Sequence, residues 1–186
     1  MNKSLPVIFT VGHSTRTLVE LAKILRAHGV ERLVDVRTVP RSRHNPQFNR
    51  ETLSKDLHNR HFSYRYMKTL GGFRHALGDS INTGWRNASF RGFADYMQTP
   101  AFGEALEKLL KLAEQKPTAI MCAEAVPWRC HRSLIADALT VRGYEVRDIM
   151  SVTSAKPHVL MAMARIRGQQ VTYPVDLKPS SPRSRT

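Results

Sequence analysis

The sequence predicts an α/β fold, in which a single three-layer domain has a mainly parallel sheet flanked by helices. Short runs of apolar, often β-branched residues alternate along the chain with longer segments of helical periodicity, as in parallel-sheet proteins. Several of these runs are apolar at successive positions, which is typical of strands buried on both faces. A length of 186 residues with 41% hydrophobic residues fits one domain with a core of its own.

Five short runs have the apolar or alternating pattern of strands. They cover residues 7–11, 33–36, 62–67, 118–121 and 144–150. The predicted helices have apolar residues at helical spacing, between capping signals such as Asn49, Pro100 and Gly143. They cover residues 18–28, 50–59, 90–97, 100–114, 131–142 and 157–166.

Two segments carry no periodic pattern. The first covers about residues 70–90, is Gly-rich and polar, and is predicted to be a long loop or a small insertion. Loops of this length in compact domains are often functional. The second is the basic end of the chain, and we expect the domain to span residues 1–168 and residues 169–186 to form a disordered tail.

Polar residues follow three of the predicted strands. Open parallel sheets bind ligands at the carboxyl ends of their strands, so these residues are expected to face one crevice. They are Gly12, His13 and Ser14 after the first strand, Asp35 and Arg37 at the second, and Cys122 and Glu124 after residues 118–121.

Cys122 is the candidate nucleophile of this crevice. Arg129, His131 and Arg132 are close in sequence, and cationic neighbours or a helix N-terminus favour a thiolate. Such an arrangement suits covalent catalysis or the binding of an anion, which Arg132 can hold in bidentate fashion. The alternative is that Cys122 is a small hydrophobic side chain at the end of a strand.

Proton transfer is assigned to Glu124, His13 and His131. A carboxylate in a basic pocket serves as a general acid or base, and histidine titrates near neutral pH. Each has a structural alternative: Glu124 pairs with Arg132 or Arg37, and His131 caps the helix that follows it.

The remaining candidates are predicted to bind substrate. Gly12 permits a tight turn whose amides face an anion, although Ser14 is equally suited to capping the first helix. Asp35 lies in an apolar strand and needs a partner, which is Arg37 or Arg132. Arg43 in a basic loop and Trp85 in the long segment are suited to phosphates and bases, unless Trp85 anchors a lid packed on the sheet.

Together these residues form motifs that resemble a known family. The motifs are Gly12-His13-Ser14, Asp35-Val36-Arg37 with Pro40-Arg41-Ser42-Arg43, Leu70-Gly71-Gly72, Phe90-Arg91-Gly92-Phe93-Ala94-Asp95-Tyr96-Met97, and Met121-Cys122-Ala123-Glu124 with Arg129-Cys130-His131-Arg132. From about Val7 to Ile149 the chain resembles the family called domain of unknown function 488 (DUF488). The resemblance implies a compact α/β domain and supplies no reaction.

The charge points to anionic partners. The chain carries 29 Lys and Arg against 15 Asp and Glu, a net charge of +14, which attracts nucleotides or nucleic acid, unless it only keeps the protein soluble. Two neighbouring cysteines without a disulfide framework, no signal peptide and no apolar run of membrane-spanning length predict a cytoplasmic protein without a membrane partner. The sequence carries no signal for an oligomeric state.

These observations lead to three hypotheses. The first is an enzyme that acts on a phosphate-bearing or nucleotide-like substrate, without a cofactor. The second is a nucleic-acid-binding module without catalysis. The third and weakest is a zinc or redox-switch site at Cys122 and Cys130, although the spacing of these cysteines lacks the Cys-x2-Cys pattern of structural zinc sites.

Overall fold

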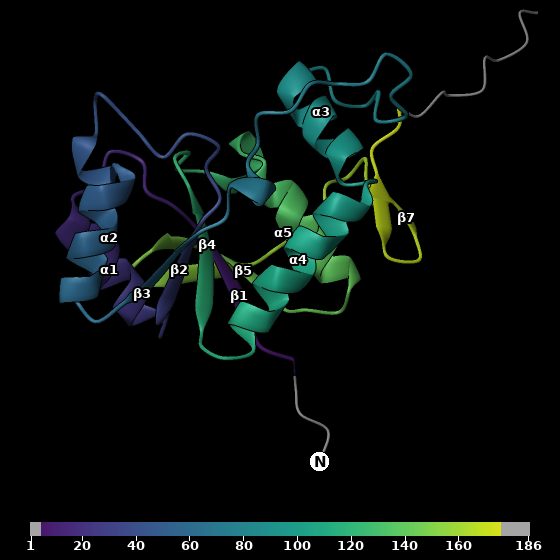
Figure 1. Cartoon of the computed structure of the whole chain (residues 1–186). Coiled ribbons are helices and arrows are strands. Elements are labelled where there is room, and N and C mark those ends of the chain that lie inside the picture. The colour runs from purple at the N-terminus through teal and green to yellow at the C-terminus, as the bar shows by residue number, and fades with distance from the viewer. Residues whose placement is uncertain (1–4, 176–186) are drawn as a thin grey trace, which may run out of the picture.

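A six-stranded sheet forms the centre of the computed structural model, which describes residues 5–175 (Figure 1). Its order is β3-β2-β4-β1-β5-β6, and the first five strands in this order are parallel while β6 is antiparallel to β5. The mainly parallel sheet is therefore confirmed. The strands are β1 (Ile8–Gly12), β2 (Arg32–Asp35), β3 (Ser63–Tyr66), β4 (Thr118–Cys122), β5 (Val146–Ser151) and β6 (Ser154–Pro157).

Helices cover both faces of the sheet (Figure 1). One face packs against α1 (Leu18–Ala27) and α2 (Arg50–Asn59). The other packs against α3 (Ala88–Tyr96), α4 (Pro100–Ala113) and α5 (Arg132–Val141). The three layers predicted from the sequence are thus confirmed.

The side chains of the buried strand β4 pack against helices on both faces of the sheet. All five of its residues are buried, and successive side chains point to opposite faces. Ala119 and Met121 join the core beneath α1 and α2, whereas Ile120 and Cys122 join the core beneath α3, α4 and α5. A strand buried on both faces needs an unbroken apolar run, which is the pattern that the sequence has here.

The ends of the helices follow the capping rules. Thr17 forms a capping box with Glu20 at the start of α1, so Ser14 is not the cap of this helix. Asn87 accepts hydrogen bonds from the first amides of α3, and Thr99 caps α4 with Pro100 at its first position. These side chains satisfy amides that have no partner inside the helix.

The predicted helix over residues 157–166 is wrong. Residues 154–157 instead form β6, and the chain then reaches a hairpin of β7 (Arg165–Arg167) and β8 (Gln170–Thr172), joined through Gly168 at φ 59°. Pairing of β6 with β5 outweighs the weak helical pattern of this segment.

The predicted boundary at residue 168 also shifts. Val171 and Tyr173 are 2% and 0% exposed, so the folded chain reaches at least residue 173. Tyr173 donates its backbone amide to Asn82 and its hydroxyl to Asp137, which ties this end of the chain to the rest. Residues 176–186, the remainder of the predicted tail, lie outside the described residues.

The order of the strands opens a crevice at the carboxyl end of β4. Neighbouring strands β1 and β4 continue into α1 and α5, which lie on opposite faces of the sheet. Ligand sites form where the connections diverge in this way. The register puts Gly12 opposite Cys122 and Asp35 opposite Met121, so the three polar groups lie side by side. Within residues 5–175, no helix is long and apolar enough to span a membrane.

Candidate functional site

A cavity of about 250 Å³ lies at the carboxyl end of β4. Its walls come from the loop after β2, from the long segment before α3 and from the connection between β4 and α5. The lining consists of residues 37–39, 72–73, 89–90, 122–124 and 129–131. The predicted candidates Arg37, Cys122, Glu124, Arg129 and His131 are therefore brought together.

The loop after β4 turns its carbonyl groups toward the protein interior. The amide of His13 donates to the carbonyl of Cys122 at 2.9 Å, and the amide of Ser14 donates to that of Ala123 at 2.9 Å. The next two carbonyls, of Glu124 and Ala125, accept from the guanidinium of Arg132 at 2.6 and 3.0 Å.

This arrangement fixes the direction of the loop amides. A trans peptide points its N–H opposite to its carbonyl, and residues 5–175 contain no cis peptide bond. The amides of residues 123–126 therefore point away from β1 and α5. Among the described residues, the amides of Ala123, Glu124 and Ala125 have no backbone or side-chain acceptor. These three successive amides are therefore left without a protein acceptor from residues 5–175 on the side away from β1 and α5.

The amides expected to bind an anion are thus not those of the Gly12–Ser14 turn. His13 and Ser14 use theirs to hold the loop after β4. Gly12 is needed because a Cβ atom there would lie 1.8 Å from the carbonyl oxygen of Glu124. Ser14, at φ 50°, supports the loop and does not line the cavity.

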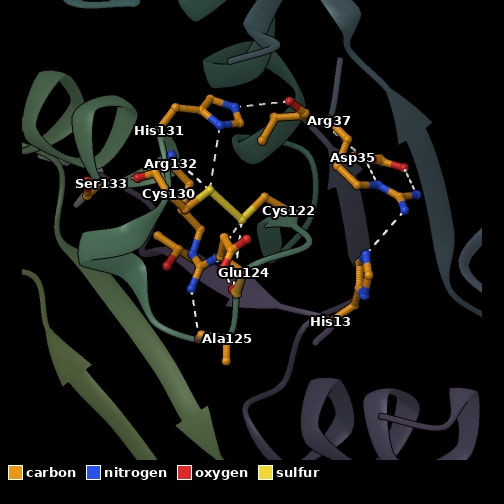
Figure 2. The surroundings of a disulfide bond; sticks show 12 residues. His13, Asp35, Arg37, Cys122, Glu124, Ala125, Cys130, His131, Arg132 and Ser133 are labelled. Atoms are coloured by element: carbon orange, nitrogen blue, oxygen red, sulfur yellow. Dashed lines mark hydrogen bonds and ion pairs between the residues drawn. A yellow bond between two sulfur atoms is a disulfide. The ribbon is translucent and has the colours of Figure 1, made fainter. Parts of the chain in front are cut away.

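Arg132 is a buried cation beneath this loop (Figure 2). Its side chain is 1% exposed, and besides the two carbonyls it donates from Nη1 to Cys122 Sγ at 2.6 Å. None of the ion pairs among the described residues includes it. Burial lowers the pKa of Arg132 to about 10, which still leaves it protonated at neutral pH.

A disulfide joins Cys122 and Cys130 across the floor of the cavity (Figure 2). Cys122 is 2% exposed and Cys130 is 5% exposed. The Sγ of Cys130 accepts from the amide of Arg132 and lies 3.5 Å from His131 Nδ1. From the sequence, Cys130 was expected in the site only under the third hypothesis, as the partner of Cys122 in a zinc or redox-switch site.

His131 is held by its Nε2 atom. This nitrogen lies 3.1 Å from the carbonyl oxygen of Val36 and 3.0 Å from that of Leu70. Because carbonyls only accept, Nε2 carries the hydrogen and Nδ1 faces Cys130 as an acceptor in the neutral ring. Burial lowers the pKa of His131 to about 4, so the ring is neutral at pH 7. Gly72 packs so closely on this ring that a Cβ atom would lie 2.5 Å from Nδ1.

His13 lies behind the cavity wall and not in the cavity. Its Nδ1 donates to its neighbour's carbonyl, Ser14 O, at 2.8 Å, and its Nε2 accepts from Arg37 Nη1 at 3.2 Å. The ring stacks on Phe48. Burial lowers the pKa of His13 to about 4, and the neutral ring can accept from the adjacent cation. The structure therefore gives His13 the position of a residue that orients Arg37.

Asp35 and Arg37 form a buried ion pair, one of the two pairings expected for Asp35. Arg37 Nη2 lies 2.6 Å from Asp35 Oδ2, and Tyr64 donates its hydroxyl to the same oxygen at 2.8 Å. Burial, with the Asp35 carboxylate second, raises the pKa of Tyr64 above its ordinary value. Arg37 is also one of the residues that line the cavity, and this network fixes the direction of its guanidinium, which points toward Asp35 and His13.

Three predicted site residues lack the partner or the position that was expected of them. Glu124 is exposed at the cavity, and the ion pairs of the described residues do not include it, so its expected pairing with Arg132 or Arg37 is absent there. Arg43 is exposed and is not part of the cavity lining. Trp85 stacks on Phe90 and packs into the core instead of lining the cavity.

The cavity has an aromatic rim, of which Phe90 was part of a sequence motif while Phe73 was not expected. Phe73 is 72% exposed and Phe90 is partly buried, and both line the cavity beside Val39, which is 54% exposed. Both phenylalanines belong to the segment of about residues 70–90 or its edge, whose lack of periodicity was the available signal. In the part of the chain that the structure describes, no group of three or more His, Cys, Asp or Glu is placed to hold a metal ion.

Comparison with known proteins gives one finding. A family model described as "Domain of unknown function DUF488" matches residues 17–139, which include the loop after β4 and most of α5. No curated protein and no solved structure matches the chain.

Proposed function

Because the chain belongs to the DUF488 family, whose description names no reaction, we propose from the cavity itself that this protein is an enzyme acting on a phosphate-bearing or nucleotide-like substrate. The observation that carries this proposal is the loop of residues 122–125, whose carbonyls are all bonded toward the interior. The outward amides, with Arg129 at the same cavity, suit a phosphate group.

The proposed chemistry uses the thiol of Cys122 in the reduced protein. Cys122 Sγ attacks the bound phosphorus, a sulfur–phosphorus bond forms, and the bond from phosphorus to the leaving oxygen breaks. The sulfur attacks as the thiolate, and protonated Glu124, exposed at the same cavity, donates its proton to the leaving oxygen. The Glu124 carboxylate then accepts a proton from a water whose oxygen bonds to phosphorus. The sulfur–phosphorus bond breaks, and inorganic phosphate and the thiolate are released. His13 and His131 take no direct part, since hydrogen bonds occupy the ring nitrogens of His13 and hold Nε2 of His131.

The test is an activity screen of the reduced full-length protein against nucleotides and simple phosphoesters. We expect Cys122→Ser to abolish turnover and Glu124→Gln to lower it by about 10²–10⁴-fold, as for the loss of a general acid or base. Arg43→Gln is a matched control outside the cavity and should leave turnover unchanged. Lack of turnover by the wild type, together with no binding of inorganic phosphate by calorimetry, would refute the proposal.

A second candidate is the nucleic-acid-binding module, favoured by the net charge of +14 and the exposed arginines Arg41 and Arg43. Binding to an oligonucleotide should then weaken steeply with salt and survive Cys122→Ser. Fluorescence anisotropy at several salt concentrations measures this, and a lack of binding at low salt would remove the candidate.

A further inference from the structure

We propose that Cys122 and Cys130 form a reversible dithiol–disulfide pair, in which Cys122 reacts with a peroxide and Cys130 resolves the oxidised product. The thiol chemistry stands on the surroundings of the two sulfurs. Its consequence, that oxidation stops the reaction at the anion site, rests on the proposed function.

The surroundings of Cys122 favour a thiolate. Arg132 is 1% exposed, and its hydrogen-bond partners among the described residues are two carbonyl oxygens and Cys122 Sγ. Of these direct partners, only the sulfur can carry a negative charge, while the carboxylates of Asp148 and Glu124 act on the guanidinium without a direct contact. A cation in direct contact with the sulfur stabilises the thiolate, so loss of the thiol proton is favoured in the reduced protein. A thiolate is the form of cysteine that reacts with peroxides.

The surroundings of Cys130 are different. Its sulfur faces the amide of Arg132 at the start of α5 and the unprotonated Nδ1 of His131. In the reduced protein the neutral imidazole can accept the hydrogen of the Cys130 thiol. The partial charge of the amide at the start of α5 favours a thiolate less than the full charge of the guanidinium at Cys122 does. Cys122 is therefore the more reactive sulfur, and Cys130 is suited to resolve its oxidised product.

The reaction balances with a peroxide as the oxidant. The Cys122 thiolate attacks one peroxide oxygen, the O–O bond breaks, and the products are the sulfenic acid of Cys122 and an alcohol or water, with one proton taken up. Cys130 then attacks the Cys122 sulfur, a disulfide forms, and one water leaves. Two electrons pass from the pair of thiols to the peroxide, and a dithiol reductant such as dithiothreitol reverses the change.

Two features make this pair an effective switch. Both sulfurs line the same cavity, so a small peroxide can reach them although each cysteine is nearly buried. They are also the two cysteines of the whole chain, so no third thiol competes for the sulfenic acid. In the disulfide form the Cys122 sulfur is bonded to the Cys130 sulfur and is no longer a thiolate, so it cannot attack a substrate.

The first test counts thiols in the full-length protein before and after peroxide. We expect the wild type to lose both titratable thiols, to become lighter by two hydrogens, and to recover with dithiothreitol. Cys130→Ser should instead pass to the sulfinic acid at Cys122, which dithiothreitol does not reverse. A wild type that keeps both thiols, or overoxidises as readily as Cys130→Ser, overturns the proposal.

The second test concerns Arg132 and is made in the Cys130→Ser background, where Cys122 is the single thiol. The pH dependence of its alkylation should shift to higher pH in Arg132→Gln, with roughly tenfold slower alkylation at pH 7. Arg132→Lys keeps a cation and should restore part of the alkylation rate. If Arg132→Gln fails to fold, the lysine variant still tests the role of the cation. Equal alkylation profiles in folded Arg132→Lys, folded Arg132→Gln and their parent contradict the role of the cation.

Binding of inorganic phosphate by calorimetry separates the two proposals. Both forms should bind phosphate, because the loop amides are in place with the disulfide formed, whereas only the reduced protein should turn over substrate. A reduced protein that binds no phosphate refutes the proposed function, while the thiol counts still test the dithiol–disulfide pair. Equal turnover by the two forms refutes the switch.

Discussion

At the scale of single residues, the site depends on the loop that Arg132 and Gly12 hold in place. The guanidinium of Arg132 donates hydrogen bonds to two carbonyls of this loop, and the missing side chain of Gly12 leaves room for the carbonyl of Glu124. Neither residue needs to touch a substrate for its loss to matter. The direction of the outward amides depends on both.

Substitution Gly12→Ala should therefore disrupt the site. A methyl group would lie 1.8 Å from a backbone oxygen, which cannot move without displacing the loop. We expect weaker phosphate binding and a loss of about 1–3 kcal/mol in the free energy of unfolding, as for other overpacked sites. Calorimetry and urea unfolding measure the two effects.

Gly103→Ala is the matched control. Gly103 lies in α4 with nothing within 4 Å of the added methyl group, and alanine favours a helix by roughly 0.5–1 kcal/mol. This variant should be at least as stable as the wild type and bind phosphate equally. If Gly12→Ala behaves in the same way, the role given to Gly12 is wrong.

A second residue-scale feature is His158, for which no role was predicted. Its Nδ1 lies 2.9 Å from Asp148 Oδ2, and its Nε2 lies 2.8 Å from Asp137 Oδ1. Burial alone would lower the pKa of His158, but the hydrogen bonds to Asp137 and Asp148 outweigh it and raise the pKa to about 9. The protonated ring links the segment after β6 to both α5 and β5.

This link makes stability depend on pH. A pKa raised from 6.5 to about 9 in the folded state means that the contribution is fully present below pH 6.5 and is lost as the pH rises through about 9. At about 1.4 kcal/mol per unit, it amounts to roughly 3 kcal/mol. Urea unfolding of the wild type and His158→Gln should therefore differ strongly at pH 6 and little above pH 10. The exposed His44→Gln is the control, and parallel pH profiles for all three proteins would exclude the link.

At the scale of elements, the end of the chain secures the long segment that forms part of the cavity wall. Tyr173 donates its amide to Asn82 at 2.8 Å and accepts from the amide of Gly84 at 2.8 Å. Its ring lies edge-on to Trp85, and its hydroxyl donates to Asp137 at 2.7 Å. The segment after β8 thus connects the long segment to α5.

Tyr173 should contribute to stability in two separable ways. Tyr173→Phe removes only the hydrogen bond to a buried carboxylate and should cost about 1–3 kcal/mol. Tyr173→Ala also removes the buried ring and should cost about 3–5 kcal/mol. Tyr96→Phe is the control, since the Tyr96 hydroxyl has no hydrogen-bond partner in residues 5–175. Unfolding free energies measure the series, and hydrogen exchange should show faster opening of residues 82–85 in Tyr173→Ala. A Tyr173→Ala protein as stable as the wild type would exclude this role.

At the scale of the whole molecule, the net charge of +14 opposes folding by self-repulsion. Several ion pairs of the described residues are exposed, and exposed pairs contribute little stability. Added salt screens this repulsion and should therefore stabilise the folded state of the protein.

Stability is expected to rise as sodium chloride increases from about 0.01 to about 0.15 M, over which the Debye length falls from about 30 to about 8 Å. The midpoint of thermal unfolding, recorded at several sodium chloride concentrations, measures this stability. Arg43→Glu, an exposed reversal of charge, should raise the midpoint at low salt and have less effect at high salt. A midpoint that falls with added salt in the wild type would show that attractive pairs outweigh the repulsion.

The sequence by itself determined the α/β class, the five parallel strands, five of the helices and the meeting of three polar groups at one edge of the sheet. These features follow from local patterns, because apolar periodicity and capping residues act within a few positions of the chain. Only the tertiary structure decided the strands after residue 153, where pairing of β6 with β5 and of β7 with β8 overrode the local pattern. It also decided what each site residue contacts: the disulfide of Cys122 with Cys130, the position of His13 behind Arg37, and the link of His158 to Asp137 and Asp148. Such partners depend on distances between segments far apart in sequence, and burial then fixes their protonation, which no local pattern records.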